Sequence, residues 1–599
     1  MSAVSRRTFF GQATAGLAAL SSLNPNGRAD TASTQTEASS TAPIPGLRVA
    51  ILGDPSAKVE WTDVALEALK SIGFNTIQLN IAWGDHVFDE PLNLIDVVTL
   101  PGESPLPTTP ARHDEIERRA ALAKRRGLRT LFHFGSPYLD YNPYTGEVSR
   151  IGQGGVDDNS FDSNYDVSNP KVAQHELDLL QQFRRLFPDV DDILVYTYDQ
   201  DAWQTAEFQH SKYSDGVPLS ERLPEYIRKL HHVWTDGRAD THRMWWEPWE
   251  LSAGQVFAVL PQLPRSGFGL MIHTNIGEVQ RAVPVDLWFR NTARICHGLG
   301  IPVIAEAFWA SHNEELEPLE IPAPRLADEA WLAIMRQPGI AGIKEYYGLQ
   351  PTKIDLDTEV LRIRLAGFTG GTQELLQKIA EPFGNAAGEV FTYLNLLSDA
   401  RQIYPSDASW FGREIGKARI DHGWSAAFIR GQQANTPAWR STRKIIFMMT
   451  DDVQPPFWLL EDIQLRCQIA ADTTQQALTV GNRILNLVSD AAQKELFTHI
   501  QHDADHFRRV CLSYALHIRE TNIAQQLRSD LALVKPLNER LVAEMRRVLE
   551  ADVANQDGKG RVVEMMRLFS ENPAAFVQKY LLPTDVTVGE KGIFTLTSR

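Results

Sequence analysis

Residues 48–83 read RVAILGDPSAKVEWTDVALEALKSIGFNTIQLNIAW, which is an apolar run, an amphipathic stretch and a second apolar run. The two outer runs, 48–54 and 75–83, are short and rich in branched apolar residues, as buried strands are. The central stretch, 61–73, has helical spacing and ends at Gly73, a residue that readily forms a left-handed helix cap. A strand, a helix and a second strand in this order predict parallel strands covered by helices.

The same alternation continues to about residue 350. Eight runs have strand character, and eight is the number of strands that closes a (β/α)8 barrel. An open doubly wound sheet is the alternative, but no GxGxxG motif of a dinucleotide-binding fold follows the first strand. We therefore predict a (β/α)8 TIM barrel over residues 47–350. Its later strands are expected at 129–135, 192–199, 243–250, 267–275, 301–309 and 341–348.

After residue 350 the strand-like runs nearly vanish and helical patterns replace them. We predict an all-helical C-terminal domain over residues 351–599, whose tail, VTVGEKGIFTLT (586–597), forms a small hairpin. The clearest helical patterns lie at 359–367, 372–384, 388–404, 475–496 and 523–553.

The N-terminus reads SRRTFFGQATAGLAAL over residues 5–20. Arg6 and Arg7 precede a mild apolar stretch that is shorter than the roughly 20 residues of a membrane span. This pattern resembles a twin-arginine export signal, and the alternative is an ordinary amphipathic helix. We predict a twin-arginine signal peptide over residues 1–29 and a Ser/Thr-rich linker over 30–46. The mature protein is then expected in the periplasm or outside the cell, with no membrane association after signal removal.

Composition excludes several classes of partner and site. The chain has 599 residues and a formal net charge of −16, so nucleic acid and anionic lipid are not expected to bind. Its three cysteines, Cys296, Cys467 and Cys511, lack metal-ligand spacing and are interpreted as buried small residues. His499, His502 and His506 share one helix face, which we interpret as a solvated face. We expect no metal and no cofactor, and the oligomeric state stays open.

Acidic and aromatic residues gather where the predicted strands end, which is the end of a (β/α)8 barrel that carries the active site. Among them, YTYDQDAW (196–203) ends the fourth strand with two aspartates and a tryptophan. We predict catalytic roles for Asp199, Asp201, Glu247 and Glu306. We predict substrate contacts from Trp83, His133, Trp203, Trp249, Glu250, His273, Trp309, Glu345 and Tyr346.

Grouped carboxylates and aromatic rings indicate a carbohydrate site. Neighbouring carboxylates raise one another's pKa, so one can stay protonated while another is ionised. Flat aromatic faces suit the apolar faces of sugar rings, and hydrolysis of a glycosidic bond needs two carboxyl groups. A single acid at a strand end is as readily explained as a helix cap or an arginine partner. Acidic residues at the ends of four predicted strands together favour a shared site.

Alternation along the fourth strand suggests which acid acts. Thr197, Asp199 and Asp201 would share one face, and Tyr196 and Tyr198 the other. The smaller and more polar set is the one we expect inside the barrel.

We therefore assign Asp201 as general acid, with Asp199 as modulator of its pKa or ligand of a sugar hydroxyl. Glu306 is assigned as nucleophile or general base, and Glu247 is its main rival. Lys344 is adjacent to Glu345 and faces the other way, so these two are not expected to act together.

A barrel with these strand-end acids and tryptophans, followed by helices, resembles the TIM-barrel glycoside hydrolases. The likeness covers roughly residues 47–400 and is nearest to the group of family 20 hexosaminidases and family 67 α-glucuronidases. It implies a proton donor at Asp199 or Asp201 and a glutamate nucleophile at Glu306. This chain has Asp-Gln-Asp at 199–201, where family 20 enzymes have adjacent Asp-Glu. Retention and inversion both stay open, as does a non-catalytic carbohydrate-binding protein on the same scaffold.

Overall fold

The structure of the protein is a computed structural model. It describes residues 44–53, 61–81, 93–135, 167–196, 213, 216–248, 251, 253–275, 280, 283–311, 319–405, 457–533, 535–559, 561–581, 586–588 and 594–596. The predicted signal peptide and almost all of the predicted linker therefore lie outside the described residues. Within the described part of the chain, none of the helices combines the length and hydropathy that a membrane span requires.

Eight parallel strands close into a barrel in their sequence order, which confirms the predicted fold class. Closure occurs where β1 pairs on one side with β2 and on the other with β8, so that Val49 lies opposite both Thr76 and Lys344. The strands are β1 (Leu47–Ile51), β2 (Thr76–Gln78), β3 (Arg129–Phe134), β4 (Asp192–Tyr196), β5 (Arg243–Glu247), β6 (Phe268–His273), β7 (Val303–Ala307) and β8 (Ile340–Glu345).

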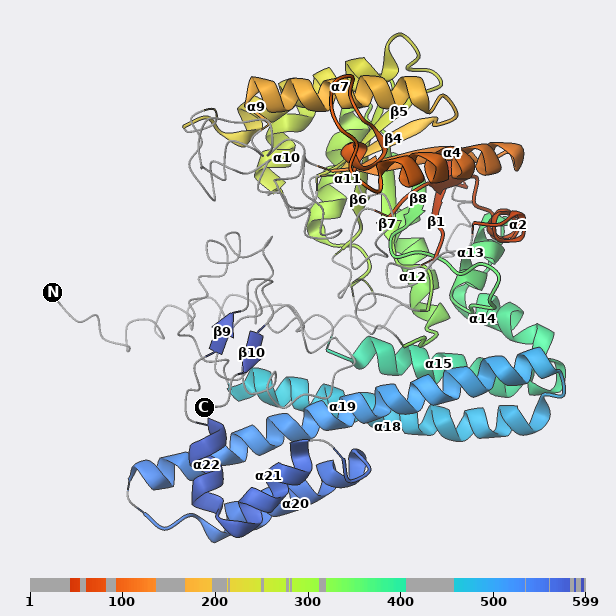
Figure 1. Ribbon diagram of the computed structural model, residues 1–599. Coiled ribbons are helices and arrows are strands. Elements are labelled where there is room, and N and C mark those ends of the chain that lie inside the picture. The colour runs from red at the N-terminus through yellow and green to blue at the C-terminus, as the bar shows by residue number, and fades with distance from the viewer. Residues whose placement is uncertain are drawn as a thin grey trace, which may run out of the picture. The chain divides into compact units, whose positions relative to one another are not determined.

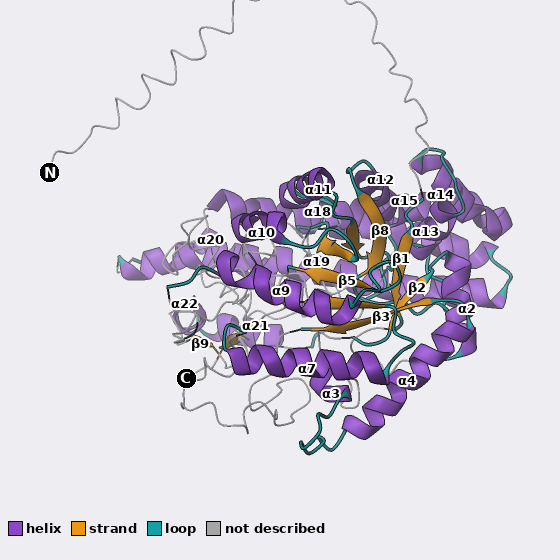
Figure 2. Ribbon diagram, turned by 90° about the horizontal axis from the view of Figure 1, so that it is seen from above, coloured by secondary structure: helices purple, strands orange, loops and turns teal. Residues whose placement is uncertain are grey.

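Helices cover the outside of the barrel, as Figure 2 shows for α2, α4, α7 and α9. The first of them begins after Thr62, whose side chain accepts a hydrogen bond from the Ala65 backbone N–H, and ends at Gly73 in the left-handed conformation that the sequence predicts. The helices of this layer are α2 (Asp63–Ile72), α3 (Leu94–Val97), α4 (Thr109–Arg125), α7 (Pro170–Leu186), α9 (Leu219–Thr235), α10 (Ala253–Val259), η1 (Leu260–Gln262), α11 (Leu287–Leu299) and α12 (Pro324–Met335).

The interior of the barrel is filled in layers. Trp245 is the largest side chain of the middle layer, and its ring lies so close to Gly269 that a Cβ there would come within 2.3 Å of it. The middle layer consists of Val49, Leu131, Leu194, Trp245, Met271 and Ile304. Because side chains alternate along a strand, the next inward layer lies two residues further along each strand. That layer, at the C-terminal end of the barrel, consists of Ile51, His133, Tyr196, Glu247, His273 and Glu306.

The strands end earlier than the apolar runs in the sequence. The seventh run was predicted to be a strand to residue 309, but β7 ends at Ala307. The next two backbone N–H groups donate to side chains, Phe308 to Gln280 Oε1 and Trp309 to Glu345 Oε2. Apolar residues thus continue into the connections, where side chains replace the neighbouring strand as hydrogen-bond partners.

The helical region follows the barrel, and a short antiparallel hairpin ends it, as predicted. Figure 1 shows α18 and α19 alongside α15. The elements are α13 (Thr358–Leu365), α14 (Thr372–Ala380), η3 (Glu381–Ala386), α15 (Ala387–Ile403), α18 (Phe457–Leu487), α19 (Ala491–Ala532), α20 (Glu539–Asn555), α21 (Arg561–Glu571), α22 (Pro573–Leu581), β9 (Val586–Val588) and β10 (Phe594–Leu596).

Two of the helices predicted in this region do not begin and end where the helices of the structure do. The pattern at 475–496 spans the break between α18 and α19, and the pattern at 523–553 is divided between α19 and α20. Pro536 explains the second break, because proline has no N–H to continue a helix, and Asn538 caps the helix that follows. The three cysteines are buried, as predicted.

The helical region contacts the segment that enters α12. Asp503 of α19 accepts a hydrogen bond from the Glu320 backbone N–H at 3.0 Å. His499 lies 3.0 Å from the Glu320 carboxylate, and its side chain is half exposed. His502 is largely exposed, whereas His506 is partly buried and its Nε2 is shielded from solvent, so the predicted solvated face holds only in part.

Candidate active site

Two glutamates and a histidine meet at the C-terminal end of the barrel. Glu247 and His273 are the last residues of β5 and β6, and Glu306 lies beside His273 in the register of β6 and β7. His273 Nε2 lies 2.7 Å from Glu247 Oε1 and 3.2 Å from Glu306 Oε2. All three side chains are buried, so their charges are not solvated by bulk water. Three residues that were each predicted from the end of a different strand therefore lie together in the structure.

A lysine completes this group. Lys344 of β8 lies opposite Glu306 in the strand register, and its Nζ donates to Glu306 Oε1 at 2.5 Å. Each oxygen of Glu306 thus lies beside a nitrogen, Oε1 beside Lys344 and Oε2 beside His273. Lys344 and Glu345 act apart, as alternation along the strand predicts, but the pairing of Lys344 with Glu306 was not predicted. Alternation within β8, which places Gly342 and Lys344 on the inner face, is the signal that could have found it.

Burial sets the protonation of the glutamate pair. It raises the pKa of Glu247 to about 7, and Lys344 and a hydrogen bond with Glu306 oppose that rise. It also raises the pKa of Glu306 to about 7, where the charge of Glu247 adds to the effect and Lys344 and His273 oppose it. Because the oxygens of the two carboxyl groups lie within 4.8 Å of one another and each group affects the pKa of the other, they titrate as a pair. Near neutral pH one carboxyl group can be protonated while the other is ionised.

The remaining inner residues add aromatic rings and amides around the pair. The ring of Tyr346 packs edge-on against His273, with 4.2 Å between ring centres. The rings of His133 and Tyr196 lie 4.9 Å apart. Asn80 exchanges two hydrogen bonds with the backbone of His133, at 2.6 and 2.9 Å, and so fixes β3 to the end of β2.

The inward position of Tyr196 corrects the predicted orientation of the fourth strand. Leu194 lies in the middle layer inside the barrel, and Val195 packs in the core outside it. Tyr196 therefore faces inward, not outward as its size and polarity suggested. The preference for Asp201 over Asp199 relied on that orientation and loses this support. Asp199 and Asp201 lie outside the described residues, as do Trp83, Trp203, Trp249 and Glu250.

Two predicted contact residues face the layer of helices. Glu345 accepts hydrogen bonds from the backbone N–H groups of Trp309, Tyr347 and Gly348. The indole of Trp309 donates to the Lys344 carbonyl and packs against Trp331 of α12. These contacts fix the turns after β7 and β8, and a role for either residue in substrate binding stays a prediction.

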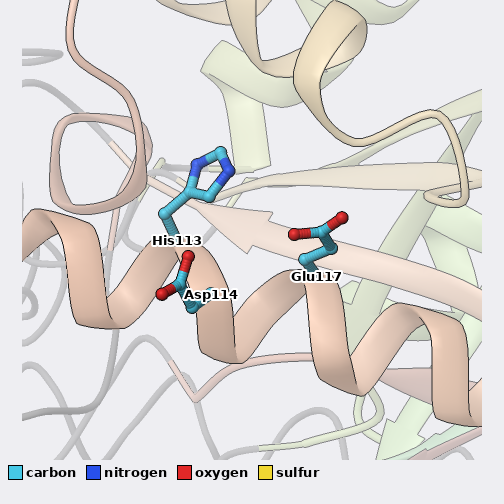
Figure 3. A group of neighbouring side chains, drawn as sticks. All are labelled: His113, Asp114 and Glu117. Atoms are coloured by element: carbon cyan, nitrogen blue, oxygen red, sulfur yellow. The ribbon is translucent and has the colours of Figure 1, made fainter.

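Two groups of side chains within the described residues have donor atoms close enough to hold a cation. One is Glu247, His273 and Glu306, whose donors lie within 4.8 Å of one another. Lys344 already brings a positive charge to this group, so a cation is not needed to neutralise one carboxylate. The other, on α4, consists of His113, Asp114 and Glu117, which Figure 3 shows on adjacent turns. Its two acids are exposed, as solvated surface acids commonly are.

No protein-family model matches the sequence, and no curated protein matches it. Among solved structures, a family 89 glycoside hydrolase from Clostridium perfringens is similar to it, with 11% identity and a TM-score of 0.37 over 90% of this chain and 63% of that one. A GH5_18 protein from Bifidobacterium longum in complex with Manβ1-4GlcNAc has 10% identity and a TM-score of 0.36 over 54% and 79%. N-acetylneuraminate lyase from Fusobacterium nucleatum has 8% identity and a TM-score of 0.27 over 61% and 90%. Likenesses this distant do not bear on the reaction.

Proposed function

We propose that this chain is an exported glycoside hydrolase that acts on an oligosaccharide or glycoside at the C-terminal end of its barrel. The observation that carries the proposal is the buried pair of Glu247 and Glu306, whose pKa values near 7 provide an acid and an anion at neutral pH. Glycosidic bond hydrolysis uses carboxyl groups in these two states.

The unfavourable free energy of burying two carboxyl groups favours a hydrolase over a non-catalytic carbohydrate-binding protein. Burying a carboxylate is unfavourable, and here two carboxylates are buried on either side of one imidazole, where burial raises the pKa of both to about 7. A binding protein can recognise sugar hydroxyls with neutral amides and hydroxyls, and it needs no such pair. We infer that the arrangement is kept for chemistry.

The closeness of the pair constrains the roles of its members. Carboxyl groups that flank a glycosidic bond are about 5–9.5 Å apart. The donor oxygens of Glu247 and Glu306 lie within 4.8 Å of one another, below that range, so we place the proton donor outside the pair. We propose Glu306 as nucleophile or general base, held in place by Lys344 and His273. The proton donor is then a separate group, and Asp201, in the connection that follows β4, remains our proposal.

A substrate screen tests this function. Wild-type protein is incubated with aryl glycosides and with plant and microbial oligosaccharides, and the first-formed product anomer is followed by NMR. Hydrolysis that is lost in Glu306→Gln and in Asp201→Asn, with binding and folding retained, is the expected result. Glu389→Gln, in the helical region, is the matched control. Saccharide binding without turnover in the wild-type protein would instead identify the binding protein.

Export is proposed from Arg6 and Arg7 and is tested separately. We expect the chain to reach the periplasm of a bacterial host with a twin-arginine pathway, and Arg6→Lys with Arg7→Lys to retain it in the cytoplasm. Cell fractionation and immunoblotting measure this. Equal export of both forms would contradict the proposal.

A further inference from the structure

One helix of the layer around the barrel carries three side chains of the kinds that bind metal ions, close to one another. His113, Asp114 and Glu117 of α4 offer donor atoms that all lie within 4.8 Å of one another. Zinc holds nitrogen and oxygen ligands at about 2.0–2.2 Å, so the donors around one zinc ion lie within about 4 Å of one another. Because both acids are exposed, small rotations of their side chains can close the remaining difference.

The ring of His113 is held in the way that metal-binding histidines are held. Its Nδ1 lies 3.2 Å from the carbonyl oxygen of Val97 in α3, and the ring packs against Phe187 with 4.7 Å between ring centres. A carbonyl oxygen only accepts, so Nδ1 carries the hydrogen and Nε2 of the neutral ring keeps its lone pair. Histidines that bind a metal through one ring nitrogen almost always donate from the other to a carbonyl, a carboxylate or water. This contact, which lies outside the group of three, therefore prepares Nε2 to bind a metal ion.

The two acids of the group differ from their neighbour on the same helix. Glu115 accepts hydrogen bonds from Arg118 and Arg119, at 2.7 and 2.8 Å, so its charge is compensated. In the part of the chain that the structure describes, the side chains of Asp114 and Glu117 make no hydrogen bond and no ion pair. Exposed acids of this kind are common, and by themselves they do not define a site. The oriented imidazole beside two uncompensated carboxylates is what distinguishes this group, and Figure 3 shows His113 and Glu117 on the same side of α4.

We propose that His113, Asp114 and Glu117 bind one zinc ion at the surface of α4. The ligands are Nε2 of the imidazole and one oxygen of each carboxyl group, and a water molecule completes the four-coordinate arrangement that zinc prefers. The group lies on a helix outside the barrel, whereas the glutamate pair lies inside it, so the ion takes no part in the proposed reaction. Its effect is on stability, because His113 links the ion on α4 to the backbone of α3.

Titration calorimetry of the full-length, metal-free protein with zinc chloride tests the site. We expect saturable binding of one zinc ion per chain. His113→Gln and Glu117→Gln should each weaken this binding by about 10-fold or more, because each removes a ligand. Glu115→Gln, on the same helix, is the matched control and should leave it unchanged. Zinc should also raise the melting temperature of the wild-type protein and not that of His113→Gln, because an ion that binds only the folded state stabilises it.

Glu247→Gln separates this site from the other group that could hold a cation. Zinc binding that survives in His113→Gln and is lost in Glu247→Gln would place the ion at the glutamate pair and overturn the proposal. Binding that none of these variants weakens, or the absence of saturable binding to the wild-type protein, would overturn it as well. The titration needs no substrate, so its result does not depend on whether the protein hydrolyses glycosides.

Discussion

The two ends of the barrel differ in the groups that surround their buried carboxylates. At the N-terminal end, Asp192 begins β4, and its two oxygens accept four hydrogen bonds: from Arg129 Nε and Nη2, the Arg243 backbone N–H and the Trp245 indole. At the C-terminal end, Glu247 and Glu306 lie on either side of His273, and Lys344 donates to Glu306. Both sites are buried, but only the second brings two carboxyl groups together.

This difference separates stability from chemistry. A carboxylate with four donors is held in one geometry, which suits a residue that ties strands together. Two neighbouring buried carboxyl groups with pKa values near 7 suit proton transfer. Active sites of (β/α)8 barrels lie at the C-terminal end, and the opposite end contributes to stability.

The largest effect is expected at Glu306. Glu306→Gln removes the anion without removing volume, so kcat should fall by about 10³-fold or more. Melting temperature should fall, because the buried Lys344 ammonium loses its charged partner, so turnover is compared per folded molecule. Steady-state kinetics on a substrate found by the screen, with thermal unfolding alongside, measures both. Near-normal turnover would exclude Glu306 from the reaction.

At the other end, Asp192→Asn should act on stability. The neutral amide leaves Arg129 without its charged partner and turns acceptor positions into donors, so the free energy of unfolding should fall by about 2 kcal/mol or more. Turnover per folded molecule should be unchanged. Chemical denaturation followed by fluorescence tests the first part. A large loss of turnover at unchanged stability would remove the contrast between the two ends.

Stability should also depend on pH through the glutamate pair. Burial raises the folded-state pKa above the unfolded value of about 4.5, so the folded protein holds a proton that the unfolded chain has lost. This contribution is fully present below pH 4.5 and is lost as pH rises toward 7. Burial also raises the pKa of Glu176 to about 8, which acts in the same direction.

The difference between wild-type protein and Glu247→Gln isolates the contribution of the pair. The wild-type protein should lose on the order of 1–3 kcal/mol more than the variant between pH 5 and 7.5. Urea unfolding at each pH measures the two slopes. Parallel slopes would mean that the pair holds no extra proton.

The smallest effect is expected from metal removal. Because Lys344 supplies the positive charge beside Glu306, dialysis against a chelator should change kcat/KM by less than about twofold, a difference well under 1 kcal/mol. Metal analysis before and after dialysis accompanies the assay. If dialysis abolished activity and added zinc restored it, a bound cation rather than a proton would neutralise the pair of Glu247 and Glu306.

The order and number of strands could be predicted from the sequence because apolar runs and helical stretches alternate with clear boundaries, such as Gly73. Which residues of each strand face the inside of the barrel could not be predicted from the sequence. Strands of a parallel barrel are apolar on both faces, so hydrophobicity does not reveal their orientation, and Tyr196 was placed outside. The partner of Lys344 was missed for another reason. Glu306 is 38 residues away and adjacent only through strand pairing.

The most direct test of the central claim is a side-by-side assay of wild-type protein, Glu306→Gln and Asp192→Asn on one glycoside, corrected for the folded fraction. We predict hydrolysis by the wild-type protein and by Asp192→Asn, and almost none by Glu306→Gln. Equal hydrolysis by Glu306→Gln and the wild-type protein would contradict the claim that the glutamate pair at the C-terminal end of the barrel performs the reaction.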